Sequence, residues 1–208
     1  NHPELTNKEL IDGLKYSRDE FHRLGITGVQ DALLKLDPGD PYFGLDAYNY
    51  LDDRNELNLH VVTAMFWNNG QPLKPQLERF KRVREKQKNS KNVKATSIKI
   101  WQDGVIETYT AAMKEPYSDR ADLFSGELQN QPSKLNAAIE ALDAEGFQIH
   151  FHAIGDYAIE VSFDSLQNAR EKNGKITLKK GEHKVELDYF QGPRYRIALQ
   201  LFWKTPSN

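Results

Sequence analysis

The stretch from Ser133 to Asp156, SKLNAAIEALDAEGFQIHFHAIGD, decides the fold because it predicts a helix followed directly by a buried strand. The helical part has apolar residues at helical spacing, and these are Leu135, Ile139 and Leu142. Gly146 is placed to end this helix, and residues 147–153 alternate in the way that strands do. Asp156 is then expected to cap a further helix, with a buried face formed by Ile159, Phe163 and Leu166.

The same strand and helix pairing recurs towards the N-terminus. The predicted strands are residues 26–29, 57–67, 96–102 and 147–153. The predicted helices are residues 6–24, 40–54, 74–88, 133–145 and one that begins at residue 156. Thr6 and Glu9 have the spacing of a capping box at the start of the first helix. Four strands that alternate with helices predict a parallel α/β architecture for residues 1–174.

The pattern changes after Gly174. Residues 176–178, 185–189 and 195–201 each alternate with a period of two, and Gly-containing turns separate them. Because no helix lies between these segments, they predict a C-terminal antiparallel β-meander. We therefore place a domain boundary near residue 174, with a β extension at 175–208.

The composition excludes several classes of protein. The net charge is −2 over 208 residues, which gives no electrostatic footprint for nucleic acid. No apolar run approaches the roughly 20 residues that span a membrane, so no membrane partner is expected. The absence of cysteine excludes disulfides and thiolate metal sites. The chain begins with Asn1 and not with Met, so we expect a fragment, and no feature indicates a compartment.

Two strands place polar side chains on one face. Alternation puts Gln148, His150 and His152 opposite the apolar residues of their strand. Two histidines at this spacing suit metal binding or acid–base chemistry, although hydrogen-bonded core residues are the commoner outcome. Lys99 lies on the equivalent face of the preceding strand. A buried lysine needs an ion pair, for which Asp103 is a candidate, or a neutral amine that reacts with carbon dioxide to form a metal-bridging carbamate.

The segment 97–107, SIKIWQDGVIE, and the segment 152–156, HAIGD, resemble the metal-dependent amidohydrolase family that includes N-substituted formamide deformylase. Residues 24–31, LGITGVQD, resemble an earlier strand of the same family. The resemblance implies a (β/α)8 barrel that hydrolyses C–N bonds of small amide-like substrates. It implies a divalent metal, with zinc as the expected ion, a carboxylated lysine at Lys99 and a metal-ligating histidine at His152. The predicted fold is therefore α/β, a partial (β/α)8 barrel of about four βα units followed by the β-meander.

Other parts of the family pattern are missing. No first-strand His-x-His pair, sixth-strand histidine or eighth-strand aspartate can be assigned, so no catalytic residue is named. Four βα units make half a barrel with two unpaired sheet edges, which a partner chain would complete. The alternative is a non-catalytic structural or glycan-binding protein, because residues 175–208 resemble the end of a protective-antigen-type β-sandwich module. Two joined gene pieces without independent function are a third reading.

Two tryptophans are candidates for substrate contacts. Trp67 ends the second predicted strand, and Trp101 lies on the lumen side of the third. Core or rim packing is the commoner role of such residues.

Overall fold

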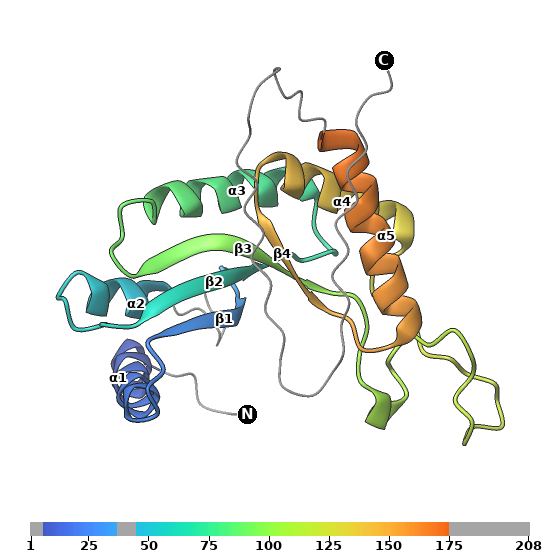
Figure 1. Ribbon diagram of the computed structural model, residues 1–208, viewed down its shortest axis with the longest axis horizontal. Coiled ribbons are helices and arrows are strands. Elements are labelled where there is room, and N and C mark those ends of the chain that lie inside the picture. The colour runs from blue at the N-terminus through green and yellow to red at the C-terminus, as the bar shows by residue number, and fades with distance from the viewer. Residues whose placement is uncertain (1–5, 37–44, 175–208) are drawn as a thin grey trace, which may run out of the picture. The chain divides into compact units, whose positions relative to one another are not determined.

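The computed structural model of the chain describes residues 6–36 and 45–174, which Figure 1 shows as coloured ribbon. Two units follow one another along the chain, Asn1–Lys175 and Ile176–Asn208, and the fold described below is that of the first. The predicted β-meander and its Gly-containing turns lie outside the described residues. The start predicted for the second helix, at residues 40–41, lies outside them too.

The central feature is a curled sheet of four parallel strands. The strands are β1 Gly28–Leu34, β2 His60–Phe66, β3 Val93–Trp101 and β4 Gln148–His152. Their order in the sheet is the order in the chain, β1-β2-β3-β4, and each neighbouring pair is parallel. A parallel sheet with a helix between successive strands, curling in this way, confirms the predicted α/β partial barrel.

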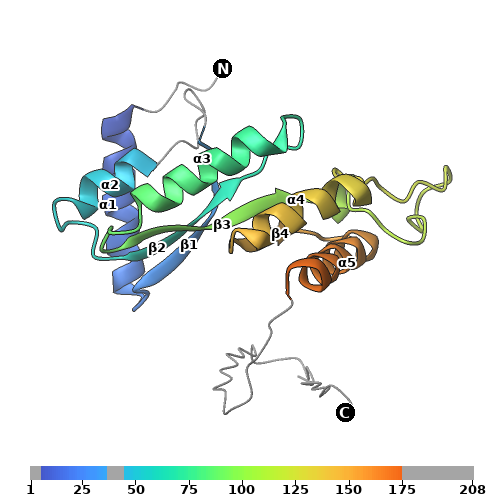
Figure 2. The same cartoon turned by 90° about the horizontal axis from the view of Figure 1, so that it is seen from above.

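The helices are α1 Asn7–Arg23, α2 Leu45–Asp52, α3 Leu73–Lys86, α4 Pro132–Ala144 and α5 Asp156–Asn173. Figures 1 and 2 show α3 and α4 running along one face of the sheet, with α5 beside α4. The core between sheet and helices is apolar, and its fully buried members include Met65, Phe80, Ile98, Ile100, Leu135, Ile139 and Leu142. The apolar face predicted for the fourth helix is therefore confirmed. Among the described residues, no helix combines the length and apolarity that crossing a membrane requires.

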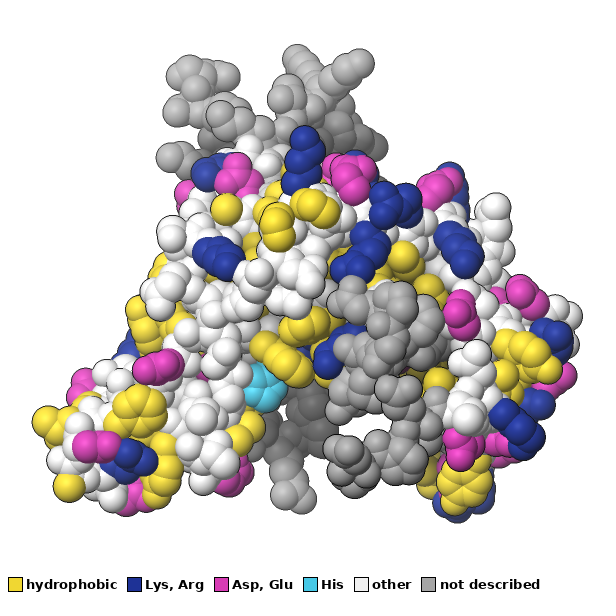
Figure 3. Space-filling view, turned by 180° about the vertical axis from the view of Figure 1, so that it is seen from behind, with side chains coloured by type: hydrophobic (Ala, Val, Ile, Leu, Met, Phe, Trp, Pro, Cys, Tyr) yellow, Lys and Arg dark blue, Asp and Glu magenta, His cyan; other side chains and the backbone are white. Residues whose placement is uncertain are grey.

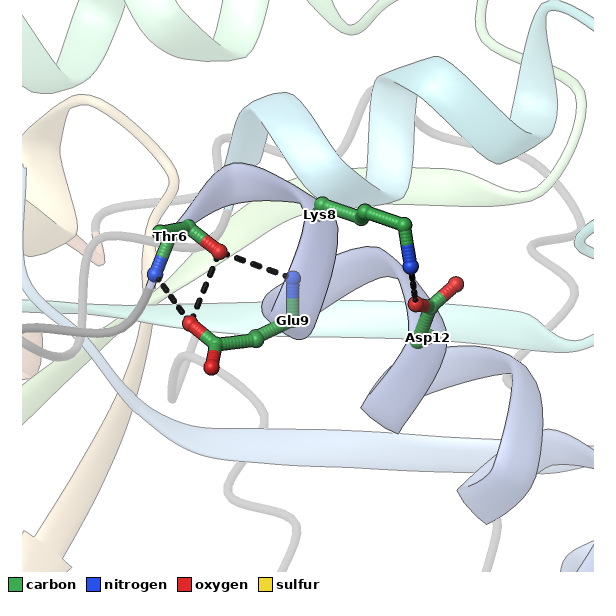
Figure 4. A network of polar contacts seen from close by, with 4 residues as sticks. All are labelled: Thr6, Lys8, Glu9 and Asp12. Carbon is green, nitrogen blue, oxygen red and sulfur yellow. Dashed lines mark hydrogen bonds and ion pairs between the residues drawn. The ribbon is translucent and has the colours of Figure 1, made fainter.

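The N-terminal helix begins as its sequence predicts. The Thr6 side chain accepts a hydrogen bond from the backbone N–H of Glu9, and the Glu9 carboxylate accepts one from the backbone N–H of Thr6. Figure 4 shows this reciprocal arrangement, together with the ion pair between Lys8 and Asp12 one turn further on. The capping box satisfies two N–H groups that the first helical turn would otherwise leave without partners.

The first strand begins later and extends further than predicted. Gly25 and Ile26 belong to the turn that ends α1 and not to the strand. Gly25 has a φ of +78°, and the N–H of Ile26 donates to Phe21 O. That left-handed turn closes α1 and delays the strand until Gly28. The strand then continues through Asp31, whose carboxylate accepts a hydrogen bond from the Tyr48 hydroxyl at 3.1 Å.

The prediction for the last helix was wrong in two respects. Gly155 is the N-cap residue, and Asp156 is the first helical residue with no capping hydrogen bond of its own. The buried residues are mostly small, namely Ala158, Val161, Ser162, Ser165 and Ala169. Of the three residues predicted for this face, Leu166 does pack against the core, whereas Ile159 is 39% and Phe163 is 67% exposed. Small side chains let α5 pack closely against α4. The buried serine hydroxyls donate to carbonyls one turn earlier, at 2.7 and 2.8 Å, so their burial costs little.

Candidate metal centre

The inner face of the sheet brings the predicted polar residues together. In the register between β3 and β4, Lys99 lies opposite His150 and Trp101 lies opposite His152. Paired residues of neighbouring parallel strands point to the same side, so all four side chains lie on the face away from α3 and α4. Figure 3, a view from behind, shows a histidine among hydrophobic side chains with a basic side chain beyond it.

Lys99 is the most unusual residue of this face. Its side chain is almost buried, with 7% of the residue exposed. Within the described part of the chain, its ammonium makes no hydrogen bond or ion pair. Burial lowers the pKa of Lys99 below its usual value, because desolvation disfavours the charged amine. The arrangement therefore raises the share of neutral, nucleophilic amine above that of an exposed lysine.

The ion pair with Asp103 that the sequence left open is not formed. The Asp103 carboxylate is buried and accepts three backbone hydrogen bonds. Oδ1 accepts from Ile154 N at 2.9 Å, and Oδ2 accepts from Ala112 N at 3.0 Å and from Gly155 N at 2.7 Å. Sequence reasoning missed this role. An Asp-Gly pair directly after a strand was the available signal, but it does not say which amides the carboxylate binds.

His150 is the neighbour of Lys99 on β4. Burial lowers the pKa of His150, and the positive charge of Lys99 lowers it further. Both effects favour the neutral imidazole, which is the form that binds metal ions. Lys99 and His150 are thus two neighbouring basic groups, and a positive charge on Lys99 disfavours a positive charge on His150.

His152 lies at the carboxyl end of β4, and its ring is held by one hydrogen bond. Nε2 lies 2.9 Å from the carbonyl oxygen of Gly104. A carbonyl only accepts hydrogen bonds, so Nε2 must bear a proton, and in the neutral ring Nδ1 then keeps its lone pair. Nδ1 has no protein partner among the described residues. Metal-ligating histidines typically donate the proton of their second nitrogen to a backbone carbonyl in this way.

Close packing fixes the carbonyl that holds His152. Gly104 donates its N–H to Thr110 O at 2.9 Å, and a Cβ on Gly104 would lie 2.0 Å from the Thr110 hydroxyl oxygen. Only glycine fits this approach, so the Asp-Gly sequence at 103–104 is a geometric requirement of the site.

The two candidate tryptophans differ in position. Trp67 is 3% exposed and belongs to the hydrophobic core, where its indole nitrogen has no hydrogen-bond partner among the described residues. Trp101 is 41% exposed and lies on the inner face, with its ring 4.9 Å from the ring of Phe66. Of the two, Trp101 is the one that a bound molecule can reach.

The number of potential ligands limits what this face can do alone. Within residues 6–36 and 45–174, no group of three or more His, Cys, Asp and Glu side chains is placed to hold a metal ion. Lys99 and His152 lie on neighbouring strands and are offset by two residues in the register, but catalytic zinc sites usually have three protein ligands and one open position.

Comparison with known families places the whole chain. The sequence model of the amidohydrolase family matches residues 3–194, which is nearly the whole chain. The chain belongs to the amidohydrolase family. The matched segment of this amidohydrolase chain contains the whole of β3 and β4. It therefore includes Lys99, Asp103 and His152.

Individual proteins are also similar to this chain. The exoenzymes regulatory protein AepA of Pectobacterium carotovorum subsp. carotovorum is 26% identical over 157 residues, which cover 75% of this chain and 32% of AepA. Two solved structures have a similar fold, an uncharacterized metal-dependent hydrolase from Pyrococcus furiosus and one from Pyrococcus horikoshii OT3. The first has a TM-score of 0.62 at 22% identity, covering 82% of this chain and 33% of the other. The second has a TM-score of 0.61 at 22% identity, covering 80% and 32%. The amidohydrolase chain thus spans about a third of the length of these proteins.

Proposed function

We propose that this chain supplies part of the metal site of an amidohydrolase that cleaves C–N bonds in amide-like substrates. The observation that supports the proposal best is the state of His152, whose Nε2–H is held by Gly104 O and whose Nδ1 keeps a free lone pair. The two structural neighbours are metal-dependent hydrolases, which agrees with a divalent metal here. We infer zinc as the ion, because neutral imidazole is a preferred zinc ligand.

Lys99 is the second proposed ligand, after reaction with carbon dioxide. The neutral amine attacks the carbon of CO2, an N–C bond forms, and the nitrogen loses one proton to solvent. The product is a carbamate whose oxygens bind metal. A buried amine with a lowered pKa and no ion-pair partner among the described residues fits this modification, because more of it is unprotonated at neutral pH.

A metal bound at this position would polarise the substrate carbonyl and lower the pKa of a water molecule. His152 and Lys99 would hold the ion, and Trp101 would contact the substrate from the rim of the inner face. Trp67 stays a weaker candidate for substrate contact, since its side chain lies in the core. Small amide-like compounds are the substrate class that the sequence resemblance suggests.

The remaining ligands must come from elsewhere. In the described sheet, β1 pairs only with β2 and β4 pairs only with β3, so each has one edge with free N–H and C=O groups. We propose that further strands, from a partner chain or from additional sequence of the same protein, pair with these edges and complete the barrel. The chain's share of about a third of its relatives' length agrees with this view.

A second candidate function is non-catalytic binding. It is favoured by the lack of a third ligand among the described residues. In that case residues 175–208, beyond the proposed domain boundary near residue 174, act as a β-sandwich remnant that binds glycans. Retention of the chain on a glycan array together with absence of bound metal favours this candidate.

Metal binding tests the main proposal. We expect titration with zinc, in bicarbonate buffer near neutral pH, to show one site that His152→Ala and Lys99→Met each weaken at least tenfold. His22→Ala is the matched control, because His22 Nε2 also contacts a backbone carbonyl, that of Asn58, at 2.9 Å but lies on α1. Intact-mass measurement should show the added mass of one CO2 on the wild type and not on Lys99→Met. Zinc binding that His152→Ala leaves unchanged would refute the proposal.

A further inference from the structure

The hydrogen bonds around Asp103 connect three segments that meet beside His152. Asp103 follows the end of β3 by two residues, and its amide partners Ile154 and Gly155 follow the end of β4 by two and three. Its third partner, Ala112, lies in the long connection between β3 and α4. A single buried carboxylate therefore joins both strand ends to the connection that covers them.

The geometry points to Asp103 as a positioning residue for His152, an inference that rests on the proposed metal site. His152 is held from two directions by adjacent residues of one segment. The carboxylate of Asp103 fixes the backbone just after His152, and the carbonyl of Gly104 accepts from its ring. Asp103 thereby keeps the ring in the tautomer that leaves Nδ1 free for metal.

The surroundings of Asp103 are built for this single arrangement. The carboxylate is 4% exposed and has no cationic partner among the described residues, so the three amide hydrogen bonds are its compensation for burial. The same Ala112 residue also links the loop to α5. Its carbonyl accepts hydrogen bonds from Tyr157 N at 3.1 Å and from Ala158 N at 3.2 Å, at the start of that helix. A Cβ on Gly155 would lie 2.0 Å from that same carbonyl, which shows how closely the two segments approach.

Replacing the Asp103 carboxylate by an amide tests its role in positioning His152 without changing the volume of the side chain. In Asp103→Asn the side chain keeps its shape, but one of its two terminal atoms becomes an NH2 group that faces at least one backbone N–H. The turn after β4 must then shift, and the contact between His152 Nε2 and Gly104 O loosens. A role confined to fold stability would lower the unfolding temperature without changing the His152 tautomer in the protein that remains folded.

The test is NMR of the metal-free, full-length chain with labelled histidine. In the wild type, we expect His152 to be almost wholly the Nε2–H tautomer. In Asp103→Asn, we expect the share of the Nδ1–H tautomer to rise about fivefold, the factor that corresponds to losing one ordinary hydrogen bond. Asp156→Asn is the control, because Asp156 also accepts from a backbone amide, Lys114 N at 2.8 Å, without contacting the amides after β4. It should leave the tautomer as in the wild type.

Two results would overturn the inference. One is a folded Asp103→Asn chain with the wild-type His152 tautomer. The other, which needs no variant and so holds if Asp103→Asn fails to fold, is rapid hydrogen exchange of the amides of Ala112, Ile154 and Gly155 in the wild type. Because both readouts are taken without metal, a chain that binds no zinc refutes the proposed function, while the Asp103→Asn spectra still decide whether Asp103 sets the His152 tautomer.

Discussion

Replacing Lys99 by methionine should stabilise the metal-free chain. Methionine keeps the length and apolar stem of lysine and removes a charged group that is 7% exposed and unpaired within the described residues. Burying a polar group without a compensating hydrogen bond costs about 1–3 kcal/mol in proteins. We expect the free energy of unfolding to rise by about this amount, which for a chain of this size is an increase in Tm of roughly 2–12 °C.

The gain should depend on pH in a defined direction. The pKa of Lys99 in the folded chain lies below its ordinary value of 10.5, so between these two pKa values the unfolded state holds more protons than the folded state. Stability of the wild type therefore rises with pH in that window. The advantage of Lys99→Met should be full below the folded pKa, shrink as pH rises through it, and vanish near pH 10.5.

The assay is urea unfolding of both chains from pH 7 to 10.5, without metal and in buffer depleted of carbon dioxide. Lys94→Met is the matched control on the same strand, because Lys94 Nζ donates to Ser90 O at 2.5 Å and to Lys88 O at 3.2 Å. It should be neutral or destabilising by about 0.5–1.5 kcal/mol for each bond lost. A Lys99→Met chain that is less stable than the wild type at pH 7 would show that Lys99 has a stabilising partner and would refute the reasoning.

Three further perturbations test other parts of the fold. Gly155→Ala should destabilise the chain by about 1–3 kcal/mol or more in urea unfolding, because the added Cβ would lie 2.0 Å from Ala112 O. Gly13→Ala is the control: a Cβ there would meet nothing within 4 Å, so the change should stabilise α1 by up to about 1 kcal/mol. Equal effects of the two substitutions on stability would contradict the packing described at Gly155. Thr6→Ala should cost the first helix about 0.5–2 kcal/mol, measured as faster hydrogen exchange of the Glu9 amide, and unchanged exchange would argue against the capping box. Phe163→Ser should change the free energy of unfolding in urea by less than about 0.5 kcal/mol, since the side chain is 67% exposed; a large loss of stability would mean that Phe163 is buried in solution.

The strands and the core helices could be predicted from the sequence because their patterns are strong. A run rich in Val, Leu and Phe placed β2, and alternation placed β3 and β4. The spacing of Leu135, Ile139 and Leu142 placed the buried face of α4. The buried face of α5 could not be predicted in the same way. There, close packing against α4 selects small residues such as Ala158 and Ser162, and the larger Ile159 and Phe163 point away. Hydrophobicity alone does not show whether a helix buries its large apolar side chains or its small ones.

The candidate site was predictable in its residues but not in its contacts. Lys99 and His152 could be assigned to one face from alternation, and the strand register places them on neighbouring strands of that face. The role of Asp103 could not be predicted, because its three partners are backbone amides separated from it by nine to fifty-two residues. Backbone groups have no sequence signature, so such hydrogen bonds appear only once the chain is folded.

The order of the strands has a consequence for how the chain is made. Because β1, β2, β3 and β4 are neighbours in space as they are in sequence, each strand after the first finds its partner in the strand synthesised just before it. Such a sheet can grow during translation, one βα unit at a time, without waiting for distant sequence. Each new strand has one edge without a partner, to which the next strand can pair. When Gly174 leaves the ribosome, that edge belongs to β4.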